Sequence, residues 1–237
     1  MSSPITSSAT ECRSVDALPA ETSPSPDRRL DGTVWSRFPL ARAGYRSVSS
    51  LAAAIGQLGI SADAFTYTSL LLSFGAGCAA ATGRLSAAAM LVLAGGFFDL
   101  LDGAVARATG TSSRWGALLD STVDRLSDGL PLLGLVVLYG HRGWLAAVPG
   151  LAMLGALTLS YARARAEALG VSLPPLFMRR AERLVVLVLS LLASAIPFPA
   201  ASLPLLGVAA LALGNFVGLG SAMRVARRSL TLPPRAP

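Results

Sequence analysis

The sequence predicts an all-α fold, an integral membrane bundle of six transmembrane helices. Of the 237 residues, 53% are hydrophobic and only 14% are charged, and the mean hydropathy is +0.59. Soluble domains carry about 25% charged residues, so this balance favours a membrane domain. Glycine, proline and polar residues divide the apolar residues into successive runs, as expected of a chain that crosses a bilayer repeatedly.

The expected helices follow one another closely. They span residues 64–82, 86–108, 115–140, 144–168, 181–197 and 201–226. The segments at their junctions read TGR, TGTSSR, GHRG, LGVSLPP and PFP, which are turn-forming in composition. Residues 61–228 should therefore form one membrane domain.

The flanks of this domain differ from it in composition. Residues 1–35 are rich in serine, threonine, proline and charge, which predicts a disordered polar tail. Residues 36–60 mix aromatic and aliphatic side chains with arginines, which favours an N-terminal juxtamembrane amphipathic helix. An ordinary linker would have a similar composition, so both interpretations stay open. Residues 229–237 are expected to form a C-terminal tail.

The basic residues predict the orientation. All 20 of them are arginines, and the net charge is +7. With six spans, one side of the membrane receives the N-terminal tail, the 108–114 turn, the 169–180 loop and the C-terminus, whereas the other side holds only Arg84 and Arg142. The positive-inside rule then predicts a multi-pass protein of the cell membrane with both termini and the active site cytoplasmic. Because topology and compositional bias account for the arginines, we do not expect nucleic-acid binding.

Acidic residues are concentrated in one short part of the chain. Between Asp63 and Glu167 the only acids are five aspartates, Asp99, Asp102, Asp120, Asp124 and Asp128. The first two stand three residues apart on one expected helix, and the next two stand four apart on the following helix. Each pair therefore faces one way.

An antiparallel packing of these two helices would bring four carboxylates into one volume. Their repulsion would forbid this arrangement unless cations or protons were bound there. Oxygen ligands of this kind suit hard divalent metals, and acids kept inside a membrane are functional as a rule. At this point an enzyme and a membrane cation carrier both fit the pattern.

The spacing around the acids is more specific than their number. Residues 99–124 read DLLDGAVARATGTSSRWGALLDSTVD, which fits D-x-x-D-G-x-x-A-R-x8-G-x3-D-x3-D at every specified position. This segment resembles the signature of the CDP-alcohol phosphotransferase family, whose members are also called CDP-alcohol phosphatidyltransferases. The resemblance implies a six-helix membrane enzyme that moves a phosphatidyl or similar group from a CDP-linked donor to an alcohol and releases CMP.

The resemblance also implies roles for the motif residues. Asp99, Asp102, Asp120 and Asp124 would hold Mg²⁺ or Mn²⁺, and Asp124 would also act as the general base. Gly103, Arg107 and Gly116 would line the site of the CDP-lipid donor. The chemistry agrees, because transfer at a pyrophosphate phosphorus needs cations on the diphosphate and a base for the attacking hydroxyl. An arginine beside the acids argues against a cation carrier.

Upstream, GISADAFTYTS is similar to the segment that opens the first span in this family. By this resemblance Asp63 and Thr66 would help to bind the donor. Ala62 stands where the family usually has proline, and Asp63 could equally well serve as a helix cap. Both interpretations of Asp63 stay open.

The acceptor is predicted from residues outside the signature. Several arginines near one cytoplasmic loop, joined by one from the last helix, suit a phosphate monoester. The surrounding sequence resembles actinobacterial phosphatidylinositol phosphate synthases, with S-Y-x-K-A-R-A-E, E-R-x-E-R and Q-R patterns. This resemblance implies inositol 1-phosphate as the acceptor, bound by Ser160, Arg163, Arg165, Arg180, Arg183 and Arg224.

Two departures keep alternatives open. Arg163 stands where that branch has lysine, and Arg179 stands where it has glutamate. Another phosphorylated polyol, or glycerol 3-phosphate as in phosphatidylglycerophosphate synthases, therefore stays possible. A different class of protein, a non-catalytic relative or a cation carrier, is the remaining alternative. The family resemblance further implies membrane lipid as a partner and a homodimer.

Overall fold

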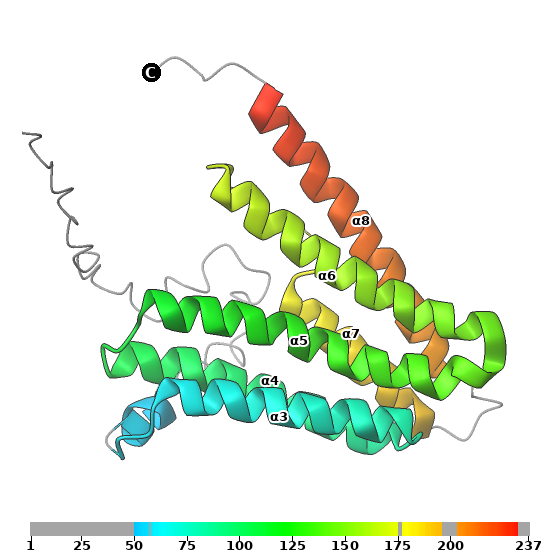
Figure 1. The fold of residues 1–237 in the computed structure, drawn as a ribbon, viewed down its shortest axis with the longest axis horizontal. Helices are drawn as coiled ribbons and strands as arrows, with labels where there is room; N and C mark the ends of the chain where they lie inside the picture. Colours follow the sequence, from blue (N-terminus) through cyan, green and yellow to red (C-terminus); the bar gives the residue numbers. More distant parts are fainter. Residues whose placement is uncertain (1–49, 57, 175–176, 196–202, 232–237) are drawn as a thin grey trace, which may run out of the picture.

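The computed structural model describes residues 50–56, 58–174, 177–195 and 203–231, and this part of the chain contains helices and no β-strand. Its six longer α-helices are α3 (Ala62–Ala81), α4 (Leu85–Ala108), α5 (Arg114–Tyr139), α6 (Ala147–Ala168), α7 (Arg180–Leu192) and α8 (Leu203–Thr231) (Figure 1). The all-α prediction is confirmed for these residues. Each predicted span overlaps one helix.

Four helical stretches in the described residues are long and apolar enough to cross a membrane. They are Ala62–Ala81, Leu85–Ala108, Arg114–Ala168 and Leu203–Thr231, and the third contains both α5 and α6. The chain reverses between those two helices in a 3₁₀ segment, Gly140–Ala146, where Gly143 has a φ of 62°. These stretches support a multi-pass membrane protein.

Helix α7 differs from its predicted span. We expected 181–197, whereas α7 is 13 residues long and continues only as the 3₁₀ turn Ala193–Ala195. A span needs about 20 residues, so α7 alone is short for a full crossing. Residues 196–202, where the chain passes to α8, lie outside the described part. Helix α8 in turn extends through Thr231, into the segment that we assigned to the C-terminal tail.

The helices form two groups that α7 connects. Figure 1 shows α3, α4 and α5 running side by side, while α6 and α8 pack together at an angle to them. Helix α7 contacts α4 on one side and α8 on the other. The main apolar core lies where the groups meet and includes Leu132, Leu135, Leu159, Leu191 and Leu211.

Glycines bring α3 and α5 into backbone contact. A Cβ atom placed on Gly134 would lie 2.1 Å from the carbonyl oxygen of Gly77, and one on Gly77 would lie 2.7 Å from the carbonyl oxygen of Leu130. Close helix packing in lipid depends on such small residues, because apolar side chains gain little by leaving lipid for protein. This contact sets the position of α5, which carries three of the aspartates.

A short helix precedes α3. Residues 50–56 are helical, and Ala52 and Ile55 pack with Phe65, Leu101 and Val105 in a second apolar cluster. This is the described part of the segment that we expected to be an amphipathic juxtamembrane helix. Residues 36–49 of that segment and the predicted tail 1–35 lie outside the described residues.

Candidate metal and phosphate-binding site

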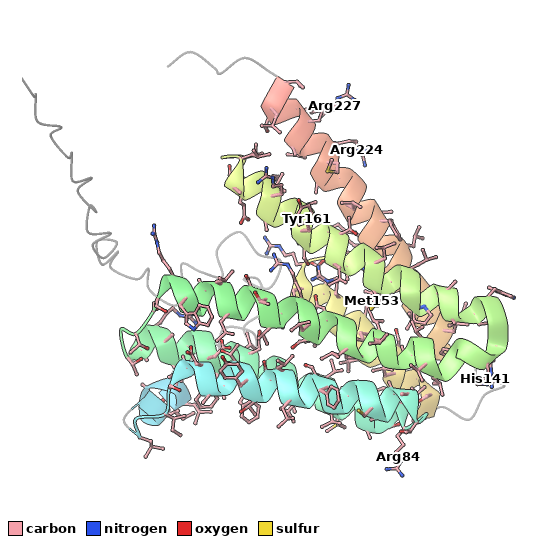
Figure 2. All side chains as sticks on the ribbon, in the orientation of Figure 1. Arg84, His141, Met153, Tyr161, Arg224 and Arg227 are labelled. Carbon is pink, nitrogen blue, oxygen red and sulfur yellow. The ribbon has the colours of Figure 1, made fainter. Side chains whose placement is uncertain are left out.

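The site lies at one end of the bundle because successive helices alternate in direction. Helices α3, α5 and α7 begin at this end, and α4 and α6 finish there. The functional residues predicted on these five helices therefore lie within about three turns of the helix ends on this side of the bundle. Arg84 and His141 lie at the opposite end of the bundle (Figure 2).

Three of the four expected metal ligands converge. Asp99 on α4 and Asp120 and Asp124 on α5 each offer a carboxylate oxygen, and these oxygens all lie within 4.8 Å of one another. Asp102 lies beside the group, 5% exposed, and its Oδ2 accepts a 2.7 Å hydrogen bond from the Thr66 hydroxyl. The acids thus meet as the helical spacing predicted, with Asp102 turned toward α3.

The donor set fits a hard divalent cation. Oδ1 of Asp99 is buried without a hydrogen-bond partner among the described residues, and Oδ1 of Asp124 has only its ion pair with Arg180, at 2.8 Å. Clustered carboxylate oxygens, one of them without a hydrogen-bond donor and two of them facing a single guanidinium group, are suited to Mg²⁺ or Mn²⁺. The chemistry of the cluster therefore agrees with a metal site.

All five residues expected to bind the donor line one pocket. Asp63, Thr66, Gly103, Arg107 and Gly116 surround it together with Asp102 and Asp120. The Arg107 guanidinium lies against Gly103, since a Cβ atom there would be 2.9 Å from Nη1. A side chain at position 103 would push this arginine away from its place.

The first turns of α3 and α5 form part of this pocket. Ser113 caps α5 by accepting a 2.9 Å hydrogen bond from the Gly116 backbone N–H. Ser61 occupies the N-cap position of α3, so Asp63 lies inside the first turn and is not the cap. The capping explanation for Asp63 is therefore wrong. Helix N-termini present backbone N–H groups and positive potential, which favour phosphate.

A second pocket adjoins the acids on the side of α6 and α7. Ser160, Arg163, Arg180 and Arg183 line it, together with Asp124 and Asp128. The structure does not bring Arg165 and Arg224 there. Both are exposed, and Nε of Arg224 donates to the Gly220 carbonyl of its own helix at 3.2 Å. Figure 2 shows Arg224 on the C-terminal half of α8.

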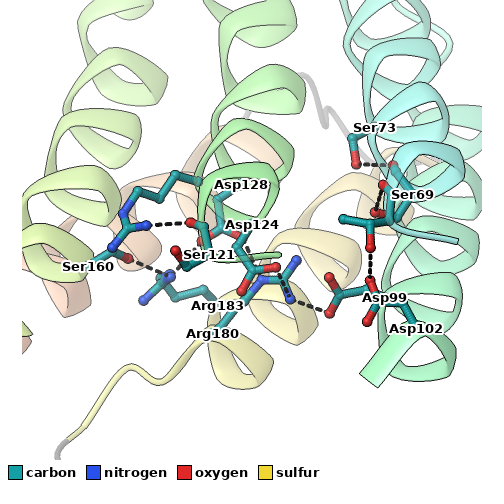
Figure 3. Close-up of polar contacts among 12 residues, drawn as sticks. Ser69, Ser73, Asp99, Asp102, Ser121, Asp124, Asp128, Ser160, Arg180 and Arg183 are labelled. Atoms are coloured by element: carbon teal, nitrogen blue, oxygen red, sulfur yellow. Dashed lines mark hydrogen bonds and ion pairs between the residues drawn. The ribbon is translucent and has the colours of Figure 1, made fainter. Parts of the chain in front are cut away.

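Arg180 and Arg183 connect this pocket to the acids (Figure 3). Arg180 Nη1 contacts Asp99 and lies 2.8 Å from Asp124 Oδ1. Arg183 is 6% exposed, and its Nη2 lies 2.6 Å from Asp128 Oδ2 and donates to Ser160 Oγ at 3.2 Å. Arg163 donates to the Phe177 carbonyl at 3.0 Å.

Sequence reasoning missed three charged residues of this second pocket. Asp128, Arg125 and Glu167 all line it, yet none was among the predicted site residues. Asp128 stands four residues after Asp124, so the helical period that linked Asp120 to Asp124 would also have placed it on this face. Glu167 matches the last position of the S-Y-x-K-A-R-A-E pattern but was given no site role, and no pattern distinguished Arg125.

The two pockets meet at the acid cluster. Asp120 lines the first, Asp124 lines the second, and both belong to the group that could hold a metal. A bound cation would therefore lie between the two pockets. The first pocket has helix N-termini and one arginine, and the second has several arginines. Such an arrangement can bring two phosphate-bearing molecules to one reaction centre.

Comparison with known proteins relates this arrangement to one family. The sequence model of one family, described as CDP-alcohol phosphatidyltransferase, matches residues 60–219. An archaetidylinositol phosphate synthase of Methanothermobacter thermautotrophicus is 39% identical over 143 residues, 60% of this chain and 72% of the relative. A phosphatidylinositol phosphate synthase of Mycobacterium marinum is 36% identical over 164 residues, 67% of this chain and 70% of the relative.

Solved structures give the same result. The crystal structure of Mycobacterium tuberculosis phosphatidylinositol phosphate synthase with CDP-DAG bound has a TM-score of 0.69 and 30% identity, over 76% of this chain and 94% of that chain. The structure of that enzyme with manganese and citrate has a TM-score of 0.70 and 29% identity, over 79% of this chain and 90% of that chain.

Proposed function

Because the chain belongs to the CDP-alcohol phosphatidyltransferase family, we propose that it transfers a phosphatidyl group from CDP-diacylglycerol to inositol 1-phosphate. The products are phosphatidylinositol phosphate and CMP. The observation that carries this proposal is the pair of pockets that meet at the acid cluster, one of them lined by three arginines besides Arg125. The printed names of the relatives support the choice of acceptor.

The donor occupies the first pocket in this proposal. Its diphosphate lies near the first turns of α3 and α5, where backbone N–H groups and the Arg107 guanidinium offset its charge. Gly103 leaves room for that guanidinium, because any larger residue would displace it. The structural relative with CDP-DAG bound supports this class of donor.

The acid cluster would hold the divalent ion. Asp99, Asp120 and Asp124 would supply its oxygen ligands, and Asp102 would add a carboxylate held by Thr66. When bound, Mg²⁺ or Mn²⁺ neutralises charge on the donor diphosphate and on CMP as it leaves. The manganese complex of the structural relative supports a metal of this kind, and either ion agrees with an all-oxygen ligand set.

Asp124 accepts the proton of the attacking hydroxyl. Among the described residues, Asp124 alone belongs to the metal cluster and also lines the second pocket. A carboxylate there lies between the donor phosphorus and the acceptor. Proton transfer to a positioned base contributes about 10²- to 10⁴-fold to a rate.

The acceptor phosphate occupies the second pocket. Arg180 and Arg183 contact the acids, and Arg163 and Ser160 also line the pocket. Guanidinium groups form bidentate hydrogen bonds with phosphate, which places the acceptor in a defined orientation. We further propose six membrane spans, cytoplasmic termini and active site, and a homodimer.

Release of CMP is the direct test of the proposed function. Purified protein with CDP-diacylglycerol and Mn²⁺ or Mg²⁺ is expected to release CMP with inositol 1-phosphate and not with free inositol. Removing the metal with EDTA should abolish release, and adding Mn²⁺ back should restore it, because the carboxylates of the cluster repel the donor diphosphate unless a divalent cation is bound. Release with EDTA present would contradict the metal site.

The same assay separates the alternatives. Release with glycerol 3-phosphate and not with inositol 1-phosphate would keep the family and exclude the proposed acceptor. A protein that binds Mn²⁺ but releases CMP with none of these acceptors would support a non-catalytic relative or a cation carrier.

Arg163 offers a mild test of the acceptor. Lysine replaces it in the branch that the chain resembles, and the Arg163 guanidinium donates a hydrogen bond to the Phe177 carbonyl. With inositol 1-phosphate as acceptor, Arg163→Lys should keep kcat and the acceptor KM within about threefold, whereas Arg163→Gln should raise that KM about tenfold through loss of a charged contact. Equal KM values for both variants would show that the charge at position 163 does not bind acceptor.

A further inference from the structure

Asp128 has no part in the reaction described above, although it lies on the same face of α5 as Asp120 and Asp124. It is absent from the group of carboxylates within 4.8 Å that could hold a metal. Its partners are arginines: Oδ2 lies 2.6 Å from Arg183 Nη2, and Oδ1 lies 3.5 Å from Arg180 Nε. The fifth aspartate therefore serves a different part of the site.

Asp128 is the main anchor of Arg183. This guanidinium is buried, at 6% exposure, and its other contacts are the Ser160 hydroxyl at 3.2 Å and the Met178 carbonyl at 3.2 Å. Both of these are longer, neutral contacts, whereas the 2.6 Å bond joins two charges. Arginine side chains have many rotamers, so one short ionic contact does much to select a single one.

Arg180 is held between two groups of acids. Its Nη1 faces Asp99 and Asp124, and its Nε faces Asp128 (Figure 3). The Asp128 carboxylate thus contacts both Arg180 and Arg183, the two pocket arginines that lie next to the acids. Asp128 follows Asp124 by about one helical turn, a rise of about 6 Å. It therefore holds Arg183 about one turn along α5 from the general base, while Arg180 reaches both acids.

We propose that Asp128 is a positioning residue that orients Arg180 and Arg183 toward the acceptor phosphate and thereby contributes to acceptor selectivity. The inference rests on the proposed function, since it assigns a role within the acceptor pocket. An acceptor binds productively when its phosphate reaches the arginines while its hydroxyl reaches Asp124.

Two other roles for Asp128 predict different results. As an additional metal ligand, it would be needed for Mn²⁺ binding. As a negative charge that masks the arginines, it would weaken phosphate binding, and its removal would strengthen that binding. The positioning role predicts the opposite sign, because loosened arginines lose more binding through disorder than the pocket gains in positive charge.

Binding measurements without turnover test these roles. Inositol 1-phosphate and Mn²⁺ are titrated separately into the full-length protein in detergent. Asp128→Asn should weaken inositol 1-phosphate binding about tenfold or more, the range found when supporting residues around a site are removed, while Mn²⁺ affinity stays within about twofold. Asp128→Glu should recover part of the lost affinity, because it restores the charge.

A double-mutant cycle provides the matched control. Because Asp128 acts largely through Arg183, Asp128→Asn combined with Arg183→Gln should weaken inositol 1-phosphate binding by less than the product of the two single effects. The pair also avoids leaving a buried guanidinium without its counter-charge, so it should fold even if a single variant does not. Steady-state assays should agree, with a raised acceptor KM and a nearly unchanged donor KM.

Several other outcomes would overturn the inference. Tighter inositol 1-phosphate binding by Asp128→Asn would assign the masking role, and lost Mn²⁺ binding would make Asp128 a metal ligand. Additive effects in the double-mutant cycle would show that Asp128 does not act through Arg183. If the wild-type protein binds inositol 1-phosphate but releases no CMP, the proposed reaction fails while the binding test of Asp128 stands. If the wild-type protein binds neither inositol 1-phosphate nor inorganic phosphate, the arginine pocket and this inference fail together.

Discussion

Replacing Asp124 with asparagine is expected to lower kcat about 10³-fold while leaving binding of CDP-diacylglycerol nearly unchanged. The carboxylate lines the pocket proposed for the acceptor and belongs to the metal cluster. Asparagine has nearly the same shape and still offers an oxygen to the cation, but it cannot take the proton of the attacking hydroxyl. CMP release and donor binding, measured on the same preparation, check this result.

The same substitution four residues along α5 is the control. Asp128→Asn removes an equal charge from the same helix face, yet it should raise the acceptor KM and leave most of kcat. A second control is metal concentration. If excess Mn²⁺ restores the rate of Asp124→Asn to the wild-type value, the residue acts only as a metal ligand, and the general base has to be sought elsewhere.

Replacing Gly134 with alanine is expected to lower the free energy of unfolding by about 3 kcal/mol, at the upper end of the usual cost of overpacking. The added methyl group would lie 2.1 Å from the Gly77 carbonyl oxygen and 3.0 Å from Ala80 Cβ. The nearest atom belongs to the backbone of a neighbouring helix, so no side-chain rotation can relieve the contact. Thermal unfolding in detergent measures the effect.

Gly220 provides a matched control within α8. A Cβ atom on Gly220 meets nothing within 4 Å, and the residue lies inside the helix. Gly220→Ala should therefore be neutral or stabilise the protein by up to about 1 kcal/mol, because alanine favours a helix over glycine. Equal destabilisation by both changes would mean that the loss reflects alanine in general and not the contact between α3 and α5.

Activity should follow the same distinction. Moving α5 away from α3 would separate Asp120 from Thr66 and Asp63, which line the donor pocket from the other helix. Gly134→Ala should thus also raise the donor KM, whereas Gly220→Ala should not. A fully stable Gly134→Ala protein with unchanged kinetics would show that the helices separate without cost.

Much of the helical organisation was predictable because it depends on local order along the chain. Apolar runs and turn residues located the helices to within a few residues, with α7 as the main departure. There the sequence continues apolar past Leu192, but the helix ends and a 3₁₀ turn follows. Apolar composition cannot show where a helix stops, since it favours burial in either conformation.

The arginines illustrate what remained unpredictable. Arg180 and Arg183 stand three apart and share a face of α7, and both reach the second pocket. Arg163 and Arg165 stand two apart, so they cannot share a face of α6, and only Arg163 lines the pocket. The direction in which α6 turns its faces depends on its packing with α5 and α8, which the order of residues does not reveal.

By itself the sequence determined which carboxylates can share a face and which glycines and arginine accompany them, because the helical period converts spacing directly into direction. Only the tertiary structure decided that Asp102 turns toward Thr66, that Asp128 joins the arginines, and that Arg224 lies elsewhere. These outcomes depend on the rotation and crossing of whole helices, and glycine contacts such as that between α3 and α5 set that geometry across residues far apart in the chain.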